Sequence, residues 1–429
     1  MNRVARLTFG LSLLFALAAC APAATPAAAP TSAPTAVPPV VAPTRAPLPT
    51  ASAPILAPTL APTAVPAPLF FVRPQGDAGP LIAYAMPGGA QRFSLPPGVL
   101  SADNQHYLAV QTGAASQLLA FDLTSGASAP IAQLAGPWAL GGVSPNGRWA
   151  ALTRLPSDSE KQTWAAANTW QTDLQVVDTH TGHSAPALKL AGNFAVDALS
   201  SAGDALFVIQ YLPAVKPDHY QVRLVDLTTG FLQDGALVDK RAPDEVMAGQ
   251  RWQAVAPADG SWLFTLYLRT TNNTAFVHAL STQNKFTLCF DLPTMTGNTL
   301  DQLRAYSLAL SPDGQTLYAA NPALGIVAKV DLNAYEVAQV ASFSPDALAP
   351  AAPAPINFAV ADARRLYFTG GAGLWRLDVT AHSVRSLSTL DSVINGLALS
   401  PDGGRLFAAR PDQPPMMLDI VSGLAFSSQ

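Results

Sequence analysis

The sequence predicts an all-β fold built from repeated four-stranded antiparallel units that begin at residue 69. Three observations support this. A turn motif recurs along the chain, short β-forming runs flank each copy, and no stretch shows sustained helical amphipathicity. The preceding 68 residues have a different composition and are expected to lie outside this fold.

The recurring turn has the sequence Ser-Pro-Asp-Gly or a close variant. Residues 311–314 and 400–403 are identical copies, and 144–147 and 256–260 are near copies. Proline presets φ in such a turn, and glycine accepts the left-handed conformation that closes a hairpin. Successive starts are 43, 56, 56, 55, 50 and 39 residues apart, close to the roughly 40–50 residues of a propeller blade. Looser copies complete this series, and they begin at Ser101, Ser200 and Ala361.

Each unit contains four short strands. An apolar run such as Tyr306–Leu310 precedes the turn, and a second run such as Thr316–Ala320 follows it. A third run ends in an apolar-Asp-apolar step, as at Val330–Leu332, and a fourth run follows. One meander of this kind leaves faces that it cannot bury, whereas radial packing of several meanders buries them. The pattern therefore predicts a β-propeller over residues 69–429.

Counting the repeats gives eight blades, with seven as the alternative. Seven turn motifs have a strand on each side, and eight third-strand segments are present. Leu69–Leu95 supplies three more strands, which we interpret as the second, third and fourth of an N-terminal blade. Because an open ring would expose two sheet edges, we expect these strands to pair beside C-terminal ones and close the ring.

Residues 1–20 resemble a bacterial lipoprotein signal peptide. Arg3 and Arg6 give a positive start, and Leu7–Leu17 is an apolar stretch too short to span a bilayer but typical of a secretory signal. Residues 17–20 (LAAC) resemble the lipobox. The resemblance implies removal of residues 1–19 and lipid modification of Cys20, which would anchor the chain in the cell membrane on its extracytoplasmic side. An ordinary signal peptide with a cysteine at its cleavage site is the alternative.

The segment 20–68 is predicted to be a disordered, lipid-anchored tether. It consists almost entirely of Ala, Pro, Thr, Val and Ser, and Arg45 is its one charged residue. Its many prolines remove backbone donors and fix φ, so neither a helix nor a sheet is expected. Such a segment favours an extended polyproline conformation that holds a domain away from a membrane.

Composition excludes several classes of partner. Charged residues make up 12% of the chain and the formal net charge is −4, so the basic surface of a nucleic-acid-binding protein is absent. A polybasic patch for acidic membrane surfaces is absent too. The two cysteines are Cys20 and Cys289. With Cys20 acylated, Cys289 has no disulfide partner and is expected to be a small buried apolar residue.

Two of the units resemble a known family. Residues 311–340 look like one repeat of the YVTN, or lactonase-like, β-propeller superfamily, and 400–426 is a second match. The same turn-strand motif occurs in the quinoprotein dehydrogenase-like group. The resemblance covers 69–429 in outline and implies seven blades as the alternative to eight. Lactonases of this superfamily use acidic, Arg and His side chains around the central channel, but no local motif identifies their equivalents in this sequence.

No residue pattern predicts a catalytic, cofactor or metal site. His180 and His183 flank a Thr-Gly turn and His219 lies in a Pro-rich segment, so solvated turns are expected at both places. The Asp of each apolar-Asp-apolar step recurs at one structural position, which indicates a turn cap rather than catalysis. Asp313 and Asp402 lack the alternating oxygen ligands and the closing Glu of a calcium loop.

Two insertions are the candidate binding loops. Trp164 and Trp170 lie in the first, 156–172, and the second, 239–252, gathers charges in a charge-poor chain. Loops on a rigid scaffold often carry binding residues, and tryptophan is enriched at recognition surfaces. We therefore predict that Trp164 and Trp170 contact a partner, with packing back onto the blades as the alternative.

Taken together, these features favour a membrane-tethered, non-catalytic binding or scaffold module. Its expected partners are the membrane, through the lipid anchor, and a protein or other envelope ligand, and the domain is expected to be a monomer without a cofactor. The alternative is an enzyme that uses the central channel, either a lactonase-like hydrolase or a quinoprotein-dehydrogenase-like protein. Converging charged residues in the channel would favour the enzyme, and an apolar or plain polar channel would favour the binding module.

Overall fold

The computed structural model describes residues 68–73, 79–86, 89–344, 359–362, 364–370, 373–389, 394, 396–400, 402–410, 413–420 and 425–427. The chain divides into two units, Met1–Ala64 and Val65–Gln429, and all described residues belong to the second. The predicted signal peptide, Cys20 and nearly all of the tether lie outside the described residues.

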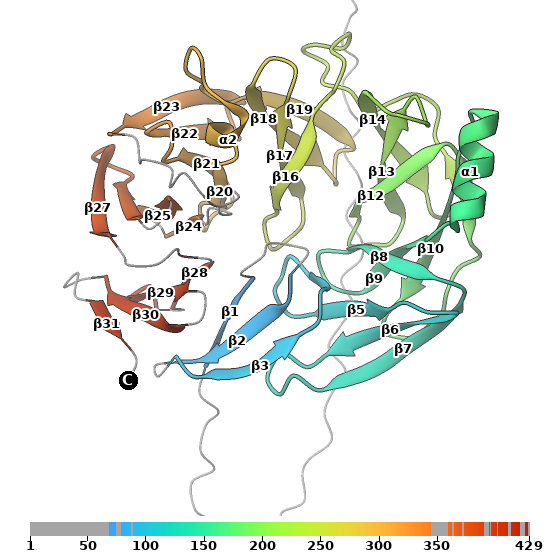
Figure 1. Ribbon diagram of the computed structural model, residues 1–429, viewed down its shortest axis with the longest axis horizontal. Helices are drawn as coiled ribbons and strands as arrows, with labels where there is room; N and C mark the ends of the chain where they lie inside the picture. The colour runs from blue at the N-terminus through green and yellow to red at the C-terminus, as the bar shows by residue number, and fades with distance from the viewer. Residues whose placement is uncertain are drawn as a thin grey trace, which may run out of the picture. The chain divides into compact units, whose positions relative to one another are not determined.

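The second unit is an eight-bladed β-propeller, as the repeat count predicted (Figure 1). Each blade is an antiparallel sheet whose strands follow one another in chain order. Seven blades have four strands, and the first has three strands within the described residues.

The bounds of the strands, sheet by sheet, are as follows: β1 (Leu69–Val72), β2 (Leu81–Ala85) and β3 (Gln91–Leu95); β4 (Val99–Leu100), β5 (Tyr107–Gln111), β6 (Ala115–Phe121) and β7 (Ser128–Ala135); β8 (Trp138–Val143), β9 (Trp149–Arg154), β10 (Gln171–Asp178) and β11 (Leu188–Ala191); β12 (Asn193–Leu199), β13 (Ala205–Leu212), β14 (His219–Asp226) and β15 (Phe231–Leu232); β16 (Gln250–Val255), β17 (Trp262–Arg269), β18 (Thr274–Ser281) and β19 (Phe286–Asp291); β20 (Ser307–Leu310), β21 (Thr316–Asn321), β22 (Ile326–Asp331) and β23 (Glu336–Ser342); β24 (Ala359–Ala361), β25 (Arg365–Gly370), β26 (Gly373–Asp378) and β27 (Ser383–Thr389); β28 (Gly396–Leu399), β29 (Arg405–Arg410), β30 (Gln413–Asp419) and β31 (Ala425–Ser427).

Side-chain chemistry explains the recurring turn between the first two strands of a blade. In the sixth blade the Ser311 hydroxyl donates to Asp313 Oδ1 at 2.5 Å and accepts from the Thr316 N–H at 3.0 Å. Gly314 has a φ of +68°, which favours glycine. The Asp that ends the third strand caps the next turn, because Asp331 Oδ1 accepts from the N–H groups of two following residues. The predicted capping role of this recurring Asp is confirmed.

Within the described residues two helices interrupt the strands, and the sequence prediction missed both. The insertion 156–172, predicted as a loop, contains α1 (Asp158–Ala167). A capping box explains its start, since Ser157 accepts from the Glu160 N–H and the Glu160 side chain accepts from the Ser157 N–H. The second helix is α2 (Leu300–Leu303). Within the described ranges, no helix is long and apolar enough to cross a membrane.

The hydrophobic core lies between the blades rather than at one centre. Each of the eight clusters of buried residues joins two neighbouring sheets. Strand alternation produces this arrangement, because successive side chains of a strand point to opposite faces. On β17, for example, Phe264 and Leu266 pack toward the sixth blade, whereas Tyr267 packs toward the fourth.

The ring closes by side-chain packing between the first and last blades. Phe70 of β1 stacks on Phe407 of β29, with ring centroids 4.4 Å apart. A Cβ on Gly396 of β28 would lie 2.8 Å from the Cβ of Val72, so these two strands meet closely. The prediction that the N-terminal strands pair beside C-terminal ones is wrong, because β1–β3 and β28–β31 form separate sheets. The interpretation of β1 as the second strand of a blade is also wrong. β1 lies beside β28, and β28 is the first strand of the eighth blade, so β1 holds the first-strand position in the first blade.

Candidate functional site

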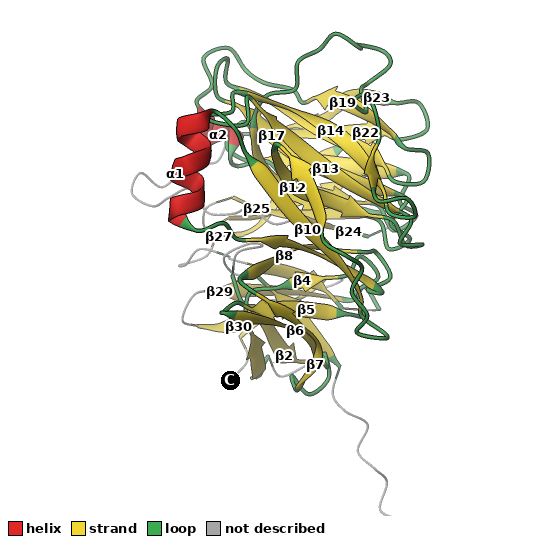
Figure 2. Cartoon of the chain, turned by 90° about the vertical axis from the view of Figure 1, so that its right-hand side faces the viewer, coloured by secondary structure: helices red, strands yellow, loops and turns green. Residues whose placement is uncertain are grey.

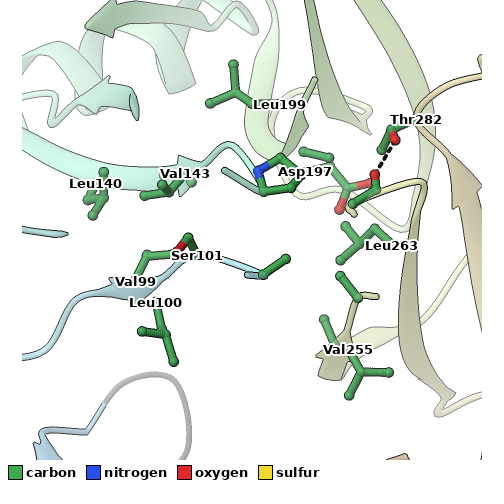
Figure 3. A pocket seen from close by; sticks show the side chains of 18 of the residues that line it. Val99, Leu100, Ser101, Leu140, Val143, Asp197, Leu199, Val255, Leu263 and Thr282 are labelled. Atoms are coloured by element: carbon green, nitrogen blue, oxygen red, sulfur yellow. Dashed lines mark hydrogen bonds between the residues drawn. The ribbon is translucent and has the colours of Figure 1, made fainter. Parts of the chain in front are cut away.

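A cavity of about 560 Å³ lies among the first strands of neighbouring blades, on the inner side of the ring. Strands β4, β8, β12 and β16 border it, together with Arg73, which directly follows β1. Apolar side chains from several blades surround it, among them Val99, Leu140 and Leu263 (Figure 3). Its volume is within the range of small-molecule sites, and its charged lining residues are Arg73, Asp197 and Arg251.

Irregular pairing in three successive first strands shapes this cavity. The register shifts between Leu140 and Gly142 in β8, between Val196 and Ala198 in β12, and between Arg251 and Gln253 in β16. A β-bulge turns a side chain away from the regular alternation. The bulge in β12 contains Asp197, and that residue lines the cavity.

Asp197 has an unpartnered carboxyl oxygen and a raised pKa. The residue is partly exposed, but its Oδ2 atom is inaccessible to solvent and has no hydrogen-bond partner. Burial raises the pKa of Asp197 to about 6, because removal from water disfavours the charged carboxylate, while the nearby positive charge of Arg251 opposes the shift. The structure therefore holds an unsatisfied carboxyl oxygen beside a cavity, which native proteins rarely retain without a reason.

Two arginines supply positive charge to the same cavity. Arg251 is the second residue of β16, and within the described part of the chain its guanidinium makes no hydrogen bond or ion pair. The guanidinium carbon of Arg73 lies 5.5 Å from the centre of the Tyr107 ring. Tyr107 is fixed in turn, because its hydroxyl donates to the Pro96 carbonyl at 2.6 Å. The cavity thus combines two positive charges with one carboxyl group.

Turns from three blades form one wall of the cavity. Gly260 has a φ of +65°, and a Cβ on it would lie 1.9 Å from Cγ of Pro145, so only glycine permits this approach. The Thr282 hydroxyl donates to the Gly260 carbonyl. The Asp103 N–H donates to the Pro145 carbonyl at 3.1 Å. These contacts hold the wall rigidly against the strands that carry Asp197 and Arg251.

Cys289 and His278 form a second group of reactive side chains, outside the cavity lining. Cys289 Sγ lies 3.9 Å from His278 Nδ1. Burial raises the pKa of Cys289 to about 12 and lowers the pKa of His278 to about 4. A thiol that stays protonated is a poor nucleophile. Cys289 therefore has a packing role, as predicted, although it is partly rather than fully buried.

The charged insertion 239–252 is fastened to the blades at its start. The Asp239 carboxylate accepts from the Cys289 N–H at 2.9 Å and pairs with Arg241 at 2.7 Å. Arg241 also donates to the carbonyls of Cys289, at 3.0 Å, and Tyr335, at 3.2 Å. This part of the insertion links the fifth and sixth blades, and its end supplies Arg251 to the cavity.

The structure brings the two predicted binding tryptophans together. The ring centroids of Trp164, on α1, and Trp170, just before β10, lie 5.2 Å apart, and both side chains are partly buried. Helix α1 has no buried residue and lies at the outside of the strands (Figure 2). Arg154 holds its first turn by pairing with Glu160 at 2.9 Å and with Asp173 at 2.7 Å. Neither tryptophan lines the 560 Å³ cavity on the inner side of the ring, which we call the axial cavity.

The predicted histidine positions fall in separate places. His180 and His183 are exposed and lie in the turn region after β10, as predicted. His219, predicted in a loop, is the first residue of β14 and lies 2.5 Å from Asp218 Oδ1. His219 pairs with Leu212, so the β13–β14 hairpin extends up to the Pro-rich residues between them. This explains why His219 was predicted in a loop. In the part of the chain that the structure describes, no three His, Cys, Asp or Glu side chains are grouped so as to hold a metal ion.

Sequence reasoning missed Asp197 and Arg251, although a signal was present. Asp197 interrupts the apolar first-strand run 194–199 (FAVDAL). Arg251 lies in the first strand of the next blade. In a chain with 12% charged residues, a charge inside a first strand is unusual. First strands line the channel of a propeller, so charges in them were candidates for a channel site.

No protein-family model matches the chain, and no curated protein sequence matches it. Among solved structures, dihydro-heme d1 dehydrogenase NirN has a TM-score of 0.49 at 14% identity, over 85% of this chain and 73% of that one. Apo AztD from Citrobacter koseri has a TM-score of 0.49 at 14% identity, over 84% and 93%. A putative 6-phosphogluconolactonase from Bacteroides fragilis has a TM-score of 0.40 at 14% identity, over 76% and 95%. At these identities the likeness concerns the fold alone.

Proposed function

We propose that this protein is a lipid-anchored, extracytoplasmic β-propeller that binds a small polar ligand in its axial cavity without transforming it. The observation that carries this proposal is the unpartnered Oδ2 atom of Asp197 beside a cavity lined by both polar and apolar groups. Ligand sites combine apolar surface with placed polar groups, and this lining contains both, with Leu140 and Leu263 on the apolar side and Asp197 and Arg251 on the polar side. Asp197 is partly exposed and lines the cavity, so a hydrogen-bond donor of a bound ligand can reach its carboxyl group.

The anchor and the location belong to the same proposal. They rest on the lipobox-like residues 17–20, the Pro-rich tether and the secretory character of residues 1–19. In this proposal the membrane is a partner through the lipid on Cys20, and the propeller is monomeric. Trp164 and Trp170 would offer a separate contact on the outside of the ring for a larger envelope partner.

A hydrolase that uses the same cavity is the second candidate. Arg73, Asp197 and Arg251 converge there, and converging charge is the feature that we expected of an enzyme. A carboxyl group with a pKa of about 6 is suited to general-base catalysis near neutral pH, and an arginine can stabilise an oxyanion. We favour binding, because the described cavity lining includes no second acid or base to protonate a leaving group.

The cavity proposal predicts selective retention of a small molecule. The full chain, purified in detergent, is incubated with a defined mixture of amino acids, hydroxy acids, sugars, sugar phosphates and lactones, and the retained compounds are identified by mass spectrometry. At least one compound should be enriched, and Asp197→Asn should reduce its retention at least tenfold. The W164A/W170A double variant should retain it fully, because neither ring lines the cavity.

Three outcomes would change the proposal. Equal retention by the wild type and Asp197→Asn would show that the retained compound does not bind through Asp197 in the cavity. Loss of retention in the tryptophan variant alone would move the ligand site to α1. Conversion of a lactone into its hydroxy acid during the incubation would replace the binding role with the hydrolase.

The anchor proposal predicts that Cys20→Ala releases the chain from the membrane or leaves an uncleaved precursor, since no sulfur remains to be acylated. Detergent phase partitioning and mass spectrometry of the mature amino terminus measure both results. Wild-type chain that is water-soluble and carries an unmodified amino terminus would contradict the anchor.

A further inference from the structure

Asp197 and Arg251 are opposite charges that face one cavity without bonding to each other. They come from the first strands of neighbouring blades, β12 and β16, and both lie at positions where the strand pairing shifts register. The charge of Arg251 acts on the Asp197 carboxyl group and lowers its pKa, against the larger effect of burial. Asp197 Oδ2 has no hydrogen-bond partner, and Arg251 is exposed to the cavity that both residues line.

The chemistry of the two groups limits what can lie between them. An ionised carboxylate only accepts hydrogen bonds, and a guanidinium only donates them. A ligand that satisfies both must therefore present a donor to Asp197 and an acceptor to Arg251. A cationic donor satisfies the Asp197 carboxylate better than a neutral hydroxyl, because it adds Coulomb attraction to the hydrogen bond that either group can donate. A carboxylate matches the planar guanidinium with two parallel hydrogen bonds.

We propose that the axial cavity takes a free α-amino acid with an apolar side chain, with its ammonium group on Asp197 and its carboxylate on Arg251. This inference rests on the proposed binding function and specifies its ligand. The apolar walls near these groups, which include Leu199, Val255 and Leu263, would surround the side chain.

Three matched probes test the two ends of the ligand separately. L-Valine carries both charged groups, its methyl ester lacks the carboxylate, and 3-methylbutanoate lacks the ammonium group. In isothermal titration calorimetry with the full chain in detergent, L-valine should bind at least tenfold more tightly than either analogue. Each analogue lacks one charged group and so loses the charge-assisted hydrogen bonds at that end, which explains a difference of this size.

Variants assign each end of the ligand to its residue. Asp197→Asn and Arg251→Gln should each weaken L-valine at least tenfold, and Arg251→Lys should fall between Arg251→Gln and the wild type. Asp197→Asn should not weaken the binding of 3-methylbutanoate, and Arg251→Gln should not weaken that of the methyl ester, because each variant removes a charge of the same sign as the probe. Asp234→Asn and Arg92→Gln are matched controls, because both residues are exposed and neither lines the cavity. Circular dichroism melting of each variant shows that the propeller is folded.

The outcomes separate this inference from the broader proposal. Equal affinity for L-valine and 3-methylbutanoate would overturn the ammonium contact, and unaltered valine binding by both variants would overturn the site. If L-valine fails to bind while another compound of the defined mixture is retained through Asp197, the amino acid is wrong and the cavity function stands. If no compound is retained, both fail.

Discussion

Phe407→Ala should lower the free energy of unfolding by about 3–5 kcal/mol, the range observed when a buried phenylalanine is truncated in a core. Phe407 is 0% exposed and stacks on Phe70, which is 3% exposed, across the junction of the last and first blades. In a closed ring each blade depends on both neighbours for burial of its faces. Loss of this junction should therefore destabilise the whole propeller and not only its last blade.

Urea unfolding followed by tryptophan fluorescence and by far-ultraviolet circular dichroism measures this effect. The tryptophans lie in other blades, so coincident transitions would show that the junction affects the entire ring. Phe231→Ala is the matched control, because Phe231 is 74% exposed and its loss should change stability by less than about 0.5 kcal/mol. A Phe407→Ala effect below about 1 kcal/mol would contradict closure through this contact.

Asp197→Asn should raise the free energy of unfolding at pH 7.5 by roughly 1–3 kcal/mol, although it should weaken ligand binding. Burial raises the pKa of Asp197 from 3.8 to about 6, and a tenfold change in proton affinity corresponds to about 1.4 kcal/mol. The folded state therefore holds the Asp197 proton more tightly than the unfolded state. The stability that this proton provides is complete below about pH 4 and is lost as the pH rises through about 6.

The pH dependence distinguishes this effect from a change in packing. The difference between Asp197→Asn and the wild type should be small at about pH 4, grow between about pH 4 and 6, and level off above that range. Asp234→Asn is the matched control for the loss of one carboxylate charge, since Asp234 is exposed and does not line the cavity. Two results would show that the ionised Asp197 carboxylate does not destabilise the folded state. One is a lower free energy of unfolding of Asp197→Asn at pH 7.5, and the other is a difference from the wild type that does not change with pH.

The propeller itself was predictable because its determinants are local. The Ser-Pro-Asp-Gly turns, the apolar runs on each side and the capping Asp of the third strand recur in the sequence, and each performs its expected role in the structure. The capping box at 157–160 was an equally local signal for α1, and it was overlooked. The position of β1 was not predictable, because a four-residue apolar strand does not reveal which strands it will lie beside.

The cavity was harder to predict because it depends on contacts between blades. Asp197 and Arg251 are 54 positions apart, and they reach the same space because β12 and β16 are first strands of adjacent blades with shifted pairing. Bulges of this kind have no clear sequence signature. Tryptophan content directed attention to Trp164 and Trp170 on the outside of the ring, whereas the unsatisfied carboxyl oxygen lies at its centre.

A crystal structure of the full chain with the compound that it retains from the defined mixture is the most direct test of the axial site. The account predicts a ligand in the cavity that contacts the Asp197 carboxyl group and the Arg251 guanidinium, with the Trp164–Trp170 pair free of ligand. A ligand seated against α1 or on the outer surface between blades, with Asp197 still without a hydrogen-bond partner, would contradict it.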